Sequence, residues 1–391
     1  MHQSDIEKLA SLPPRERADK FLDLGAELCQ KPHEPLKAGQ LPDALKSASI
    51  SHTPAETLIK NLHSVSAAEP FKGTGIRNTG HDLILKSGKL ADQVLTPKAR
   101  KEICNKAIKK GKGESVEDLA IRQLGLSLVD SDPISRCCGA YAYWQATGAE
   151  AAIPILVSGL DSDDEEEKII SAHCLAKIDL KHVKKMQGTA KDDEPQTPIQ
   201  PVKNSMTIIV HGTFAKDSSW YKPDGDFHQY IKRNVYKDLY SDPDFFFWSG
   251  RYALTKTGLK NIWGKAAQKL LSWCNSHPTK KLRIIAHSHG NNVVNMITRQ
   301  IPSCTLIQLS PPVRDWNLPN MANVSSNTLF NIHSTIDLVV KIDGGKQDYQ
   351  GTPVAQSERI KKISFFGHSD SHDPTLWKKK NVPQLVRSVC P

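Results

Sequence analysis

The residues with the clearest capacity for chemistry form the run Ala-His-Ser-His-Gly at 286–290. This run follows an apolar, strand-like stretch at 282–285 and precedes a helical pattern at 290–300. A serine in a tight turn between a strand and a helix forms a nucleophile elbow, and small residues flank it because the turn is crowded. The pattern therefore predicts that Ser288 is a nucleophile at the carboxyl edge of a sheet. The helix N-terminus behind it would stabilise developing negative charge.

A second run, His-Gly-Thr-Phe at 211–214, directly follows the apolar stretch 207–210. Glycine in such a loop lets the backbone approach a substrate closely, and the loop can supply a backbone N–H to an oxyanion hole. We expect the N–H groups of Thr213 and His289 to be the two donors. His211 is expected to brace the loop rather than to act as a general base.

A nucleophilic serine needs a general base, and the base needs a carboxylate that fixes its tautomer. In the chain order serine, acid, histidine, Asp337 is the expected acid because it comes just after a strand-like stretch. Asp343 lies beyond a further apolar stretch and is the reserve. Two histidines, His368 and His372, follow the last strand-like stretch. His368 is favoured because it comes directly off the strand, and His372 stays open as the alternative base.

The same region offers a metal-binding alternative. The histidines have HxH and HxxxH spacings, which can bind zinc; they are His287, His289, His368 and His372. The first pair flanks the elbow, where alternate side chains point apart. We therefore favour the serine chemistry and expect no metal.

Strand-like and helical stretches alternate between residues 205 and 391 and would position these side chains. The strand-like stretches lie at 207–211, 244–250, 282–288, 304–310, 328–333 and 360–367. Helical patterns lie at 226–239, 258–276 and 290–300, and again from 374 onward. Apolar strands separated by helices predict an α/β fold in which a mostly parallel sheet is covered by helices on both faces.

Motifs along 205–391 occur in the order VHGTF, FFFWSG, IIAHSHGNNV, STIDLVV and GHSDSHDP. Their residue types and order resemble those of α/β-hydrolases of the lipase and esterase class. They are similar to bacterial lipases that include phospholipase effectors of type VI secretion. The resemblance implies a Ser-His-Asp triad, an acyl-enzyme intermediate, a lipid or other carboxylic-ester substrate, and neither metal nor cofactor. Ala286 departs from the glycine usual at that position. The alternative is an interaction module that carries a weak or inactive hydrolase domain.

The segment 115–185 has helical patterns in which small residues recur. Gly139-Ala140 aligns with Ser171-Ala172 at an offset of 32 residues, and such a period is typical of stacked helix pairs. The segment resembles HEAT repeats of the short kind, which implies a protein partner. An ordinary helical bundle is the alternative.

The remaining regions have weaker patterns. Residues 1–114 contain helical pieces broken by prolines, and the sequence indicates no role for them. Residues 186–204 form a polar, proline-containing stretch typical of a linker. The expected all-α N-terminal part therefore comprises 1–114 and 115–185, and the linker joins it to the predicted hydrolase at 205–391.

Composition excludes several classes of protein. The chain has 391 residues with a mean hydropathy of −0.44, and it has no apolar run of about 18 residues, so no membrane-spanning helix is expected. Its first residues are polar and lack the apolar region of a secretory signal. Eight cysteines without a CxxC pair indicate thiols in a reducing compartment. We expect a cytoplasmic protein, with signal-independent export as the alternative.

The net charge of +10 is concentrated in the predicted hydrolase. Residues 205–391 hold 24 Lys and Arg against 13 Asp and Glu, whereas residues 1–204 hold 28 against 29. This asymmetry predicts an anionic partner such as a membrane surface. Nucleic acid is not expected, because no nucleic-acid motif accompanies the charge.

The basic face is expected on the helix predicted near 258–276. Its lysines are Lys256, Lys260, Lys265 and Lys269, and the apolar side chains expected beside them are Trp263 and Leu270. The alternative is a face that is only solvated, or one covered by the acidic segment 161–167.

Overall fold

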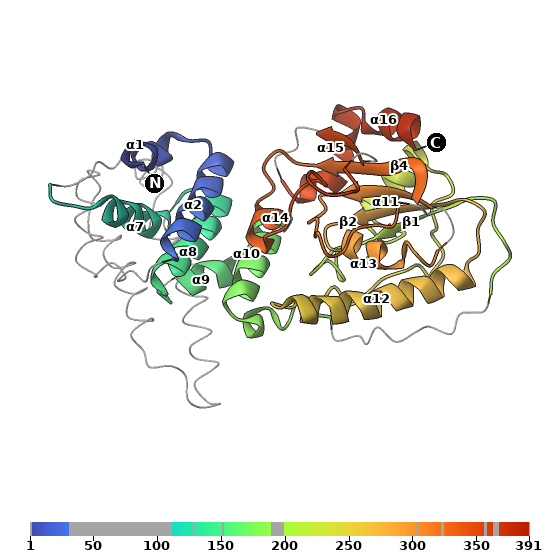
Figure 1. Cartoon of the computed structure of the whole chain (residues 1–391), viewed down its shortest axis with the longest axis horizontal. Helices are drawn as coiled ribbons and strands as arrows, with labels where there is room; N and C mark the ends of the chain where they lie inside the picture. Colours follow the sequence, from blue (N-terminus) through green and yellow to red (C-terminus); the bar gives the residue numbers. More distant parts are fainter. Residues whose placement is uncertain are drawn as a thin grey trace. The chain divides into compact units, whose positions relative to one another are not determined.

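The computed structural model describes residues 2–30, 112–128, 130–150, 152–188, 199–301, 304–321, 324–355, 358–362 and 367–390. The chain divides into two compact units, Met1–His182 and Val183–Pro391, and both are drawn in Figure 1. Most of the predicted region 1–114 and the centre of the predicted linker 186–204 lie outside the described residues. No helix among the described residues is long and apolar enough to cross a membrane.

The described part of the first unit is helical. Its α-helices are α1 (Gln3–Glu7), α2 (Pro14–Leu28), α7 (Val116–Ser127), α8 (Pro133–Thr147), α9 (Ala152–Gly159) and α10 (Glu165–Ile178), with short 3-10 turns at Leu9–Ser11 and Leu180–Val183. Local sequence determines where several of them start. The side chains of Ser115, Asp132 and Asp164 accept backbone N–H groups in the first turns of α7, α8 and α10.

Small residues let these helices approach closely. A Cβ atom at Gly139 would lie 2.0 Å from the hydroxyl oxygen of Ser127, and one at Gly159 would lie 2.1 Å from that of Ser171. Distances this short leave no room for a larger side chain. The positions that the sequence repeat aligns, 139 and 171, therefore both lie at tight helix contacts.

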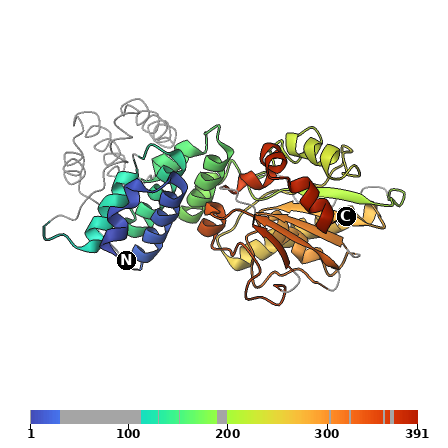
Figure 2. The same cartoon turned by 90° about the horizontal axis from the view of Figure 1, so that it is seen from above.

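The N-terminal helix α2 belongs to the same unit and lies beside α8 (Figure 2). A Cβ atom at Gly25 would lie 2.6 Å from the Cα of Ala142. The guanidinium of Arg17 donates two hydrogen bonds, of 2.8 and 2.9 Å, to the carboxylate of Asp130, and both side chains are buried. A bidentate pair of this kind holds a single geometry. Residues 14–28 therefore pack with the helices predicted at 115–185.

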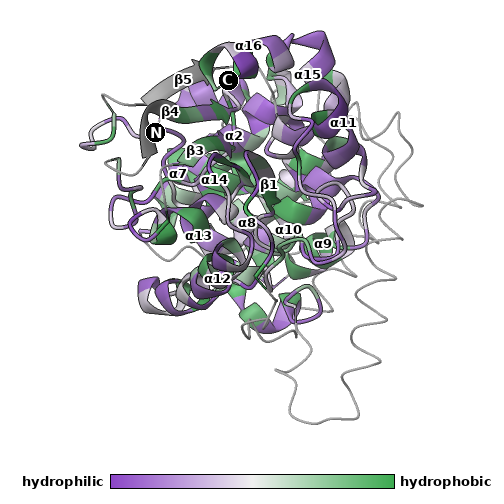
Figure 3. Ribbon diagram, turned by 90° about the vertical axis from the view of Figure 1, so that its right-hand side faces the viewer, coloured by the Kyte–Doolittle hydropathy of each residue, from purple (hydrophilic) through white to green (hydrophobic). Residues whose placement is uncertain are grey.

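The second unit is built on a five-stranded sheet. Its strands are β1 (Met206–Val210), β2 (Leu282–His287), β3 (Cys304–Leu309), β4 (Val324–His333) and β5 (Glu358–Lys362), in that spatial order, with every neighbouring pair parallel. Every residue of β1, β2 and β3 is buried, as expected for parallel strands covered on both faces. Figure 3 accordingly shows β1 and β3 in hydrophobic colours. The predicted mixed α/β class is confirmed.

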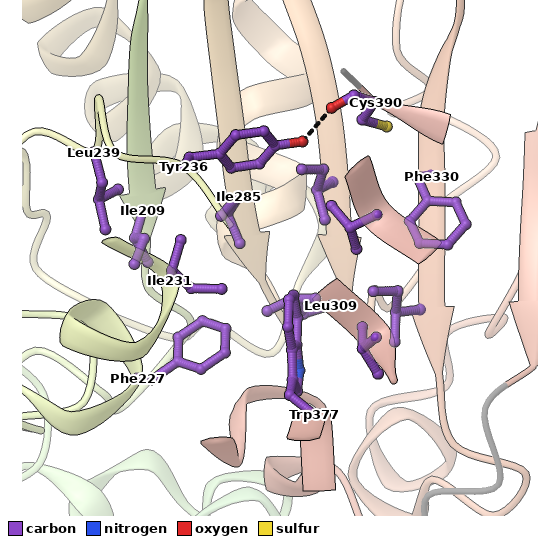
Figure 4. Packing of buried hydrophobic residues seen from close by; sticks show 14 of the residues in the cluster. Ile209, Phe227, Ile231, Tyr236, Leu239, Ile285, Leu309, Phe330, Trp377 and Cys390 are labelled. Carbon is purple, nitrogen blue, oxygen red and sulfur yellow. Dashed lines mark hydrogen bonds between the residues drawn. The ribbon is translucent and has the colours of Figure 1, made fainter. Parts of the chain in front are cut away.

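Helices cover this sheet on both sides. They are α11 (Asp226–Asn234), α12 (Lys256–Ser276), α13 (Gly290–Ile297), α14 (Leu338–Asp343), α15 (Pro374–Lys379) and α16 (Val382–Val389). Side chains of α11, α15 and α16, Trp377 among them, pack with Ile209, Ile285 and Leu309 of the strands (Figure 4). Figure 1 shows α12 and α13 on the opposite side of the sheet.

The prediction of a strand at 244–250 is wrong. Strand β1 instead pairs with Leu239, through a single parallel bridge at Thr207. The chain then runs without strand pairing to Gly250, whose φ of +65° is incompatible with an extended strand. Backbone groups of this stretch pair with the loop at 211–214 instead of with a neighbouring strand.

The helix predicted at 258–276 is present as α12, but its faces differ from the expectation. Trp263 and Leu270 are both 0% exposed and belong to the core, so they cannot form an apolar surface. Lys269 is also buried, with its Nζ 4.2 Å from the ring centroid of Phe247. The lysines of the predicted face that are exposed are Lys256, Lys260 and Lys265.

Candidate active site

Ser288 occupies a strained turn between β2 and α13. Its φ is +51°, in the left-handed region that few residues other than glycine adopt. The turn is held by hydrogen bonds from the Ser288 N–H to the Leu309 carbonyl, 2.9 Å, and from the Asn291 side chain to the Ser288 carbonyl, 2.9 Å. A Cβ atom at Gly290 would lie 2.5 Å from the carbonyl oxygen of His211. The glycine two positions after the serine is therefore required by space.

The loop at 211–214 lies against this serine. A Cβ atom at Gly212 would lie 2.6 Å from the Cβ of Ser288, so only glycine fits there. Phe214 has a φ of +62°, and its N–H donates to the carbonyl of Gly250 over 2.9 Å. Thr213 is buried between these two residues. The predicted oxyanion loop and the predicted nucleophile are thus in contact.

His211 braces that loop, in agreement with the expectation from sequence. Its Nε2 accepts the backbone N–H of Trp248 over 3.3 Å, which leaves Nδ1 to donate to the Gly212 carbonyl over 2.8 Å. The indole Nε1 of Trp248 also donates to the His211 carbonyl, 2.7 Å away. Burial lowers the pKa of His211 to about 4, so its ring is neutral at pH 7.

The His211 pKa leads to a prediction for acid stability. The unfolded chain takes up this proton near pH 6.5, whereas the fold resists it down to about pH 4. The contribution of neutral His211 to the free energy of unfolding is therefore fully present above pH 6.5. It is lost as the pH drops toward 4, and the loss is about 3 kcal/mol at most. Urea midpoints measured at pH 7.5, 6 and 5 should decline, and a His211→Gln variant should decline less steeply. An equal pH dependence in the variant would contradict this assignment.

His368 and Asp337 form a buried pair. The Nδ1 of His368 lies 2.8 Å from Oδ2 and 3.0 Å from Oδ1 of Asp337, and these side chains are 1% and 0% exposed. Asp337 also accepts the N–H of Val340 as the N-cap of α14, which fixes the carboxylate. With Nδ1–H donated to the acid, the Nε2 atom carries the lone pair that a general base needs.

The backbone of His368 is anchored to the sheet edge that holds Ser288. Its carbonyl accepts the hydroxyls of Ser310, at the end of β3, and Ser371, each over 3.0 Å. It also lies 3.3 Å from the Nε2 of His287, the residue before Ser288. The rings of His287 and His368 are 4.7 Å apart between centroids. The predicted nucleophile, acid and base are thus gathered at the carboxyl ends of the strands.

His372, the alternative base, has different surroundings. Its ring stacks on Trp220 at 4.1 Å with an interplanar angle of 9°, and it meets the His287 ring edge-on at 4.7 Å. Burial lowers its pKa to about 3. No carboxylate pairs with it among the side chains that the structure describes. The geometry therefore favours His368 as the base.

Asp343, the reserve acid, is not near His368 but pairs with the other flank of the elbow. Its Oδ2 lies 3.3 Å from the Nε2 of His289 and contacts the guanidinium of Arg314. The hydroxyl of Tyr252 donates to Oδ1 over 2.9 Å. The two acids considered from sequence therefore serve two different histidines.

The zinc alternative finds no geometric support in the described residues. No group of three or more His, Cys, Asp or Glu residues there could hold a metal ion. His287 contacts the carbonyl of His368, whereas His289 contacts Asp343, so the HxH pair serves separate partners.

Sequence reasoning missed the aromatic residues that support the site. Trp248 lies in the stretch 244–250 and packs against His211, whereas Trp220 lies in a polar loop and packs against His372. An isolated tryptophan among polar residues, as at 220, is the signal that could have indicated this role.

Comparison with models of protein families, with curated proteins and with solved structures gave no match to this chain.

Proposed function

We propose that the chain is a serine hydrolase that cleaves carboxylic esters, with membrane lipids as the substrate class. The observation that carries the proposal is the buried Asp337–His368 pair, anchored at the sheet edge where Ser288 occupies a positive-φ turn between strand and helix. A structural serine has no need of a buried His–Asp pair at the same edge. The order of strands and helices also supports the α/β-hydrolase fold that the motifs resemble.

The chemistry follows from these positions. The Oγ of Ser288 attacks the ester carbonyl carbon while Nε2 of His368 takes the hydroxyl proton, and Asp337 stabilises the resulting imidazolium. The oxyanion of the tetrahedral intermediate accepts hydrogen bonds from the backbone N–H groups of Thr213 and His289. Collapse of the tetrahedral intermediate breaks the ester C–O bond, and the alcohol leaves with the proton from His368. Water, activated by the same histidine, then hydrolyses the acyl-enzyme.

A fluorophosphonate probe and a lipid mixture test this proposal together. Purified wild type should become labelled, and it should release fatty acid from mixed membrane lipids, whereas Ser288→Ala should do neither. The products also define the position of attack and the headgroup. A wild type that is neither labelled nor active would favour the alternative, an interaction module with an inactive hydrolase domain.

We further propose that the helical first unit binds a protein partner, as HEAT-like repeats do. The support is the recurrence of tight helix contacts at positions 139 and 171. Pairs of helices stacked through small residues can present an extended surface to a partner. Chemistry is assigned to the second unit alone.

The membrane surface that we propose lies around Trp316 rather than around Trp263. The Nζ atoms of Lys256 and Lys260 lie 5.4 and 5.5 Å from the centroid of the Trp316 ring. Trp316 is half-buried, and Leu254, two residues before Lys256 in the chain, is 47% exposed. Lysines beside an indole, with an exposed leucine close in sequence, suit an anionic lipid surface.

This surface predicts a dependence on lipid charge and on salt. The variant Lys256→Gln/Lys260→Gln should bind anionic vesicles about thirtyfold more weakly, at about 1 kcal/mol per lysine. The difference should fade at high salt because screening shortens the interaction. Lys378→Gln/Lys379→Gln, on exposed positions of α15, changes the net charge equally and serves as the control. Binding to anionic vesicles is measured by co-sedimentation. An equal loss of binding in both variants would contradict a specific surface around Trp316 and would indicate an effect of net charge alone.

A further inference from the structure

A second histidine–carboxylate contact lies on the flank of the elbow opposite to His287. His289 follows the nucleophile directly and is the N-cap of α13. Its side chain is 1% exposed, its ring lies 4.8 Å from the Trp263 ring between centroids, and its Nε2 lies 3.3 Å from the Oδ2 of Asp343. The proposed triad does not use this contact.

Each ring nitrogen of His289 has a polar neighbour: the Asn292 amide at Nδ1 and the Asp343 carboxylate at Nε2. The side-chain amide of Asn292 lies 3.2 Å from Nδ1 and also donates to the carbonyl of Pro312 over 3.1 Å. Nδ1 is therefore the acceptor, and the proton is on Nε2, facing Asp343. An imidazole held in this way cannot rotate without losing a buried polar contact, and this fixes the backbone at residue 289.

Asp343 is itself held on several sides. The Tyr252 hydroxyl donates to its Oδ1 over 2.9 Å, and Arg314 contacts its Oδ2 while also donating to its backbone carbonyl over 3.0 Å. Its side chain is 1% exposed. A buried carboxylate that contacts several donors cannot move without losing these contacts, so its position is restricted.

The two histidine–acid pairs differ in their charge. Arg314 shares the carboxylate of Asp343, so the negative charge there is already neutralised. Among the side chains that the structure describes, no lysine or arginine pairs with Asp337. Asp337 can therefore stabilise an imidazolium during turnover, whereas the Asp343 pair is suited to hold position.

We propose that Asp343, acting through the side chain of His289, is a positioning residue that holds the His289 backbone N–H where the oxyanion forms. This inference rests on the proposed function. An oxyanion donor acts only at hydrogen-bond distance from the developing charge, and a displacement of about 1 Å can cost on the order of a hundredfold in rate.

The test uses the full chain with a soluble ester and a trifluoromethyl ketone, which forms a tetrahedral adduct with the serine. Asp343→Asn should lower kcat about ten- to a hundredfold with KM unchanged. Affinity for the ketone should fall by the same factor, because only the tetrahedral state uses the donor. Tyr252→Phe, which keeps the ring and removes one donor to Asp343, should show a smaller loss of the same kind.

Asp238→Asn is the matched control. The carboxylate of Asp238 lies 2.9 Å from the guanidinium of Arg283, and this pair is away from the elbow. The variant therefore also breaks an arginine–aspartate pair. It should leave kcat and ketone affinity unchanged. Wild-type kcat and ketone affinity in Asp343→Asn, or in Tyr252→Phe if Asp343→Asn does not fold, would overturn the inference alone. A wild type without esterase activity would overturn the proposed function as well.

Discussion

Ser288→Ala is expected to lower ester turnover by roughly five to six orders of magnitude while leaving the fold intact, because the mechanism that we propose uses its hydroxyl as the attacking group. Alanine retains the Cβ atom that sits against Gly212, so the contact between the loop and the elbow survives. The turn is held by backbone hydrogen bonds and by Asn291, none of which uses the serine hydroxyl.

Initial rates on a short-chain ester, thermal unfolding and fluorophosphonate labelling would check this prediction. Ser276→Ala removes a buried hydroxyl at the end of α12 and should keep full activity and labelling. Residual turnover of a few per cent in purified Ser288→Ala would assign the nucleophile to another residue. Loss of activity together with loss of the folded state would contradict the claim that the hydroxyl has no structural role.

His368→Ala is expected to be nearly as damaging as loss of the serine, whereas His372→Phe is expected to retain most activity. His368 has the acid partner at 2.8 Å, while His372 stacks on Trp220 in a parallel arrangement that phenylalanine can reproduce. Asp337→Asn should cost about 10⁴-fold in kcat, because an amide favours the wrong tautomer of the base.

These variants are compared by kcat/KM from pH 5 to pH 9. In wild type, activity should fall toward acid pH, because a protonated ring cannot accept the serine proton. The acid limb should keep its position in His372→Phe. Full activity of His368→Ala, with loss in His372→Phe, would transfer the role of base to His372.

Much of the candidate site could be predicted because its signals are local. A serine between an apolar strand and a helix needs small neighbours. A Cβ atom at Gly290 would lie 2.5 Å from the carbonyl oxygen of His211, so a side chain is excluded there. The order of Ser288, Asp337 and His368 then follows from the order of parallel strands, whose carboxyl ends meet at one edge.

Other features depend on contacts between residues distant in sequence and could not be predicted. The pattern of the stretch 244–250 predicts a strand, but the backbone N–H of Trp248 bonds to the His211 ring, which only the tertiary structure reveals. Trp263 could be placed on α12 from sequence, yet its burial depends on Trp316 and His289 packing over it. The positioning role that we propose for Asp343 likewise depends on its contact with Arg314, which the sequence does not indicate.

The serine turn has a consequence for how the proposed activity would be lost. The N–H of Ser288 bonds to the carbonyl of Leu309, and the N–H of Ser310 bonds to that of Ile332, so the interstrand ladder continues one step beyond β2 and β3. Amide hydrogens of core strands tend to exchange only when the whole cooperative unit opens. We therefore expect the N–H groups of Ser288 and Ser310 to exchange as slowly as those of the strands that they extend. Inactivation by denaturant should coincide with global unfolding, and no inactive but otherwise folded state should precede it.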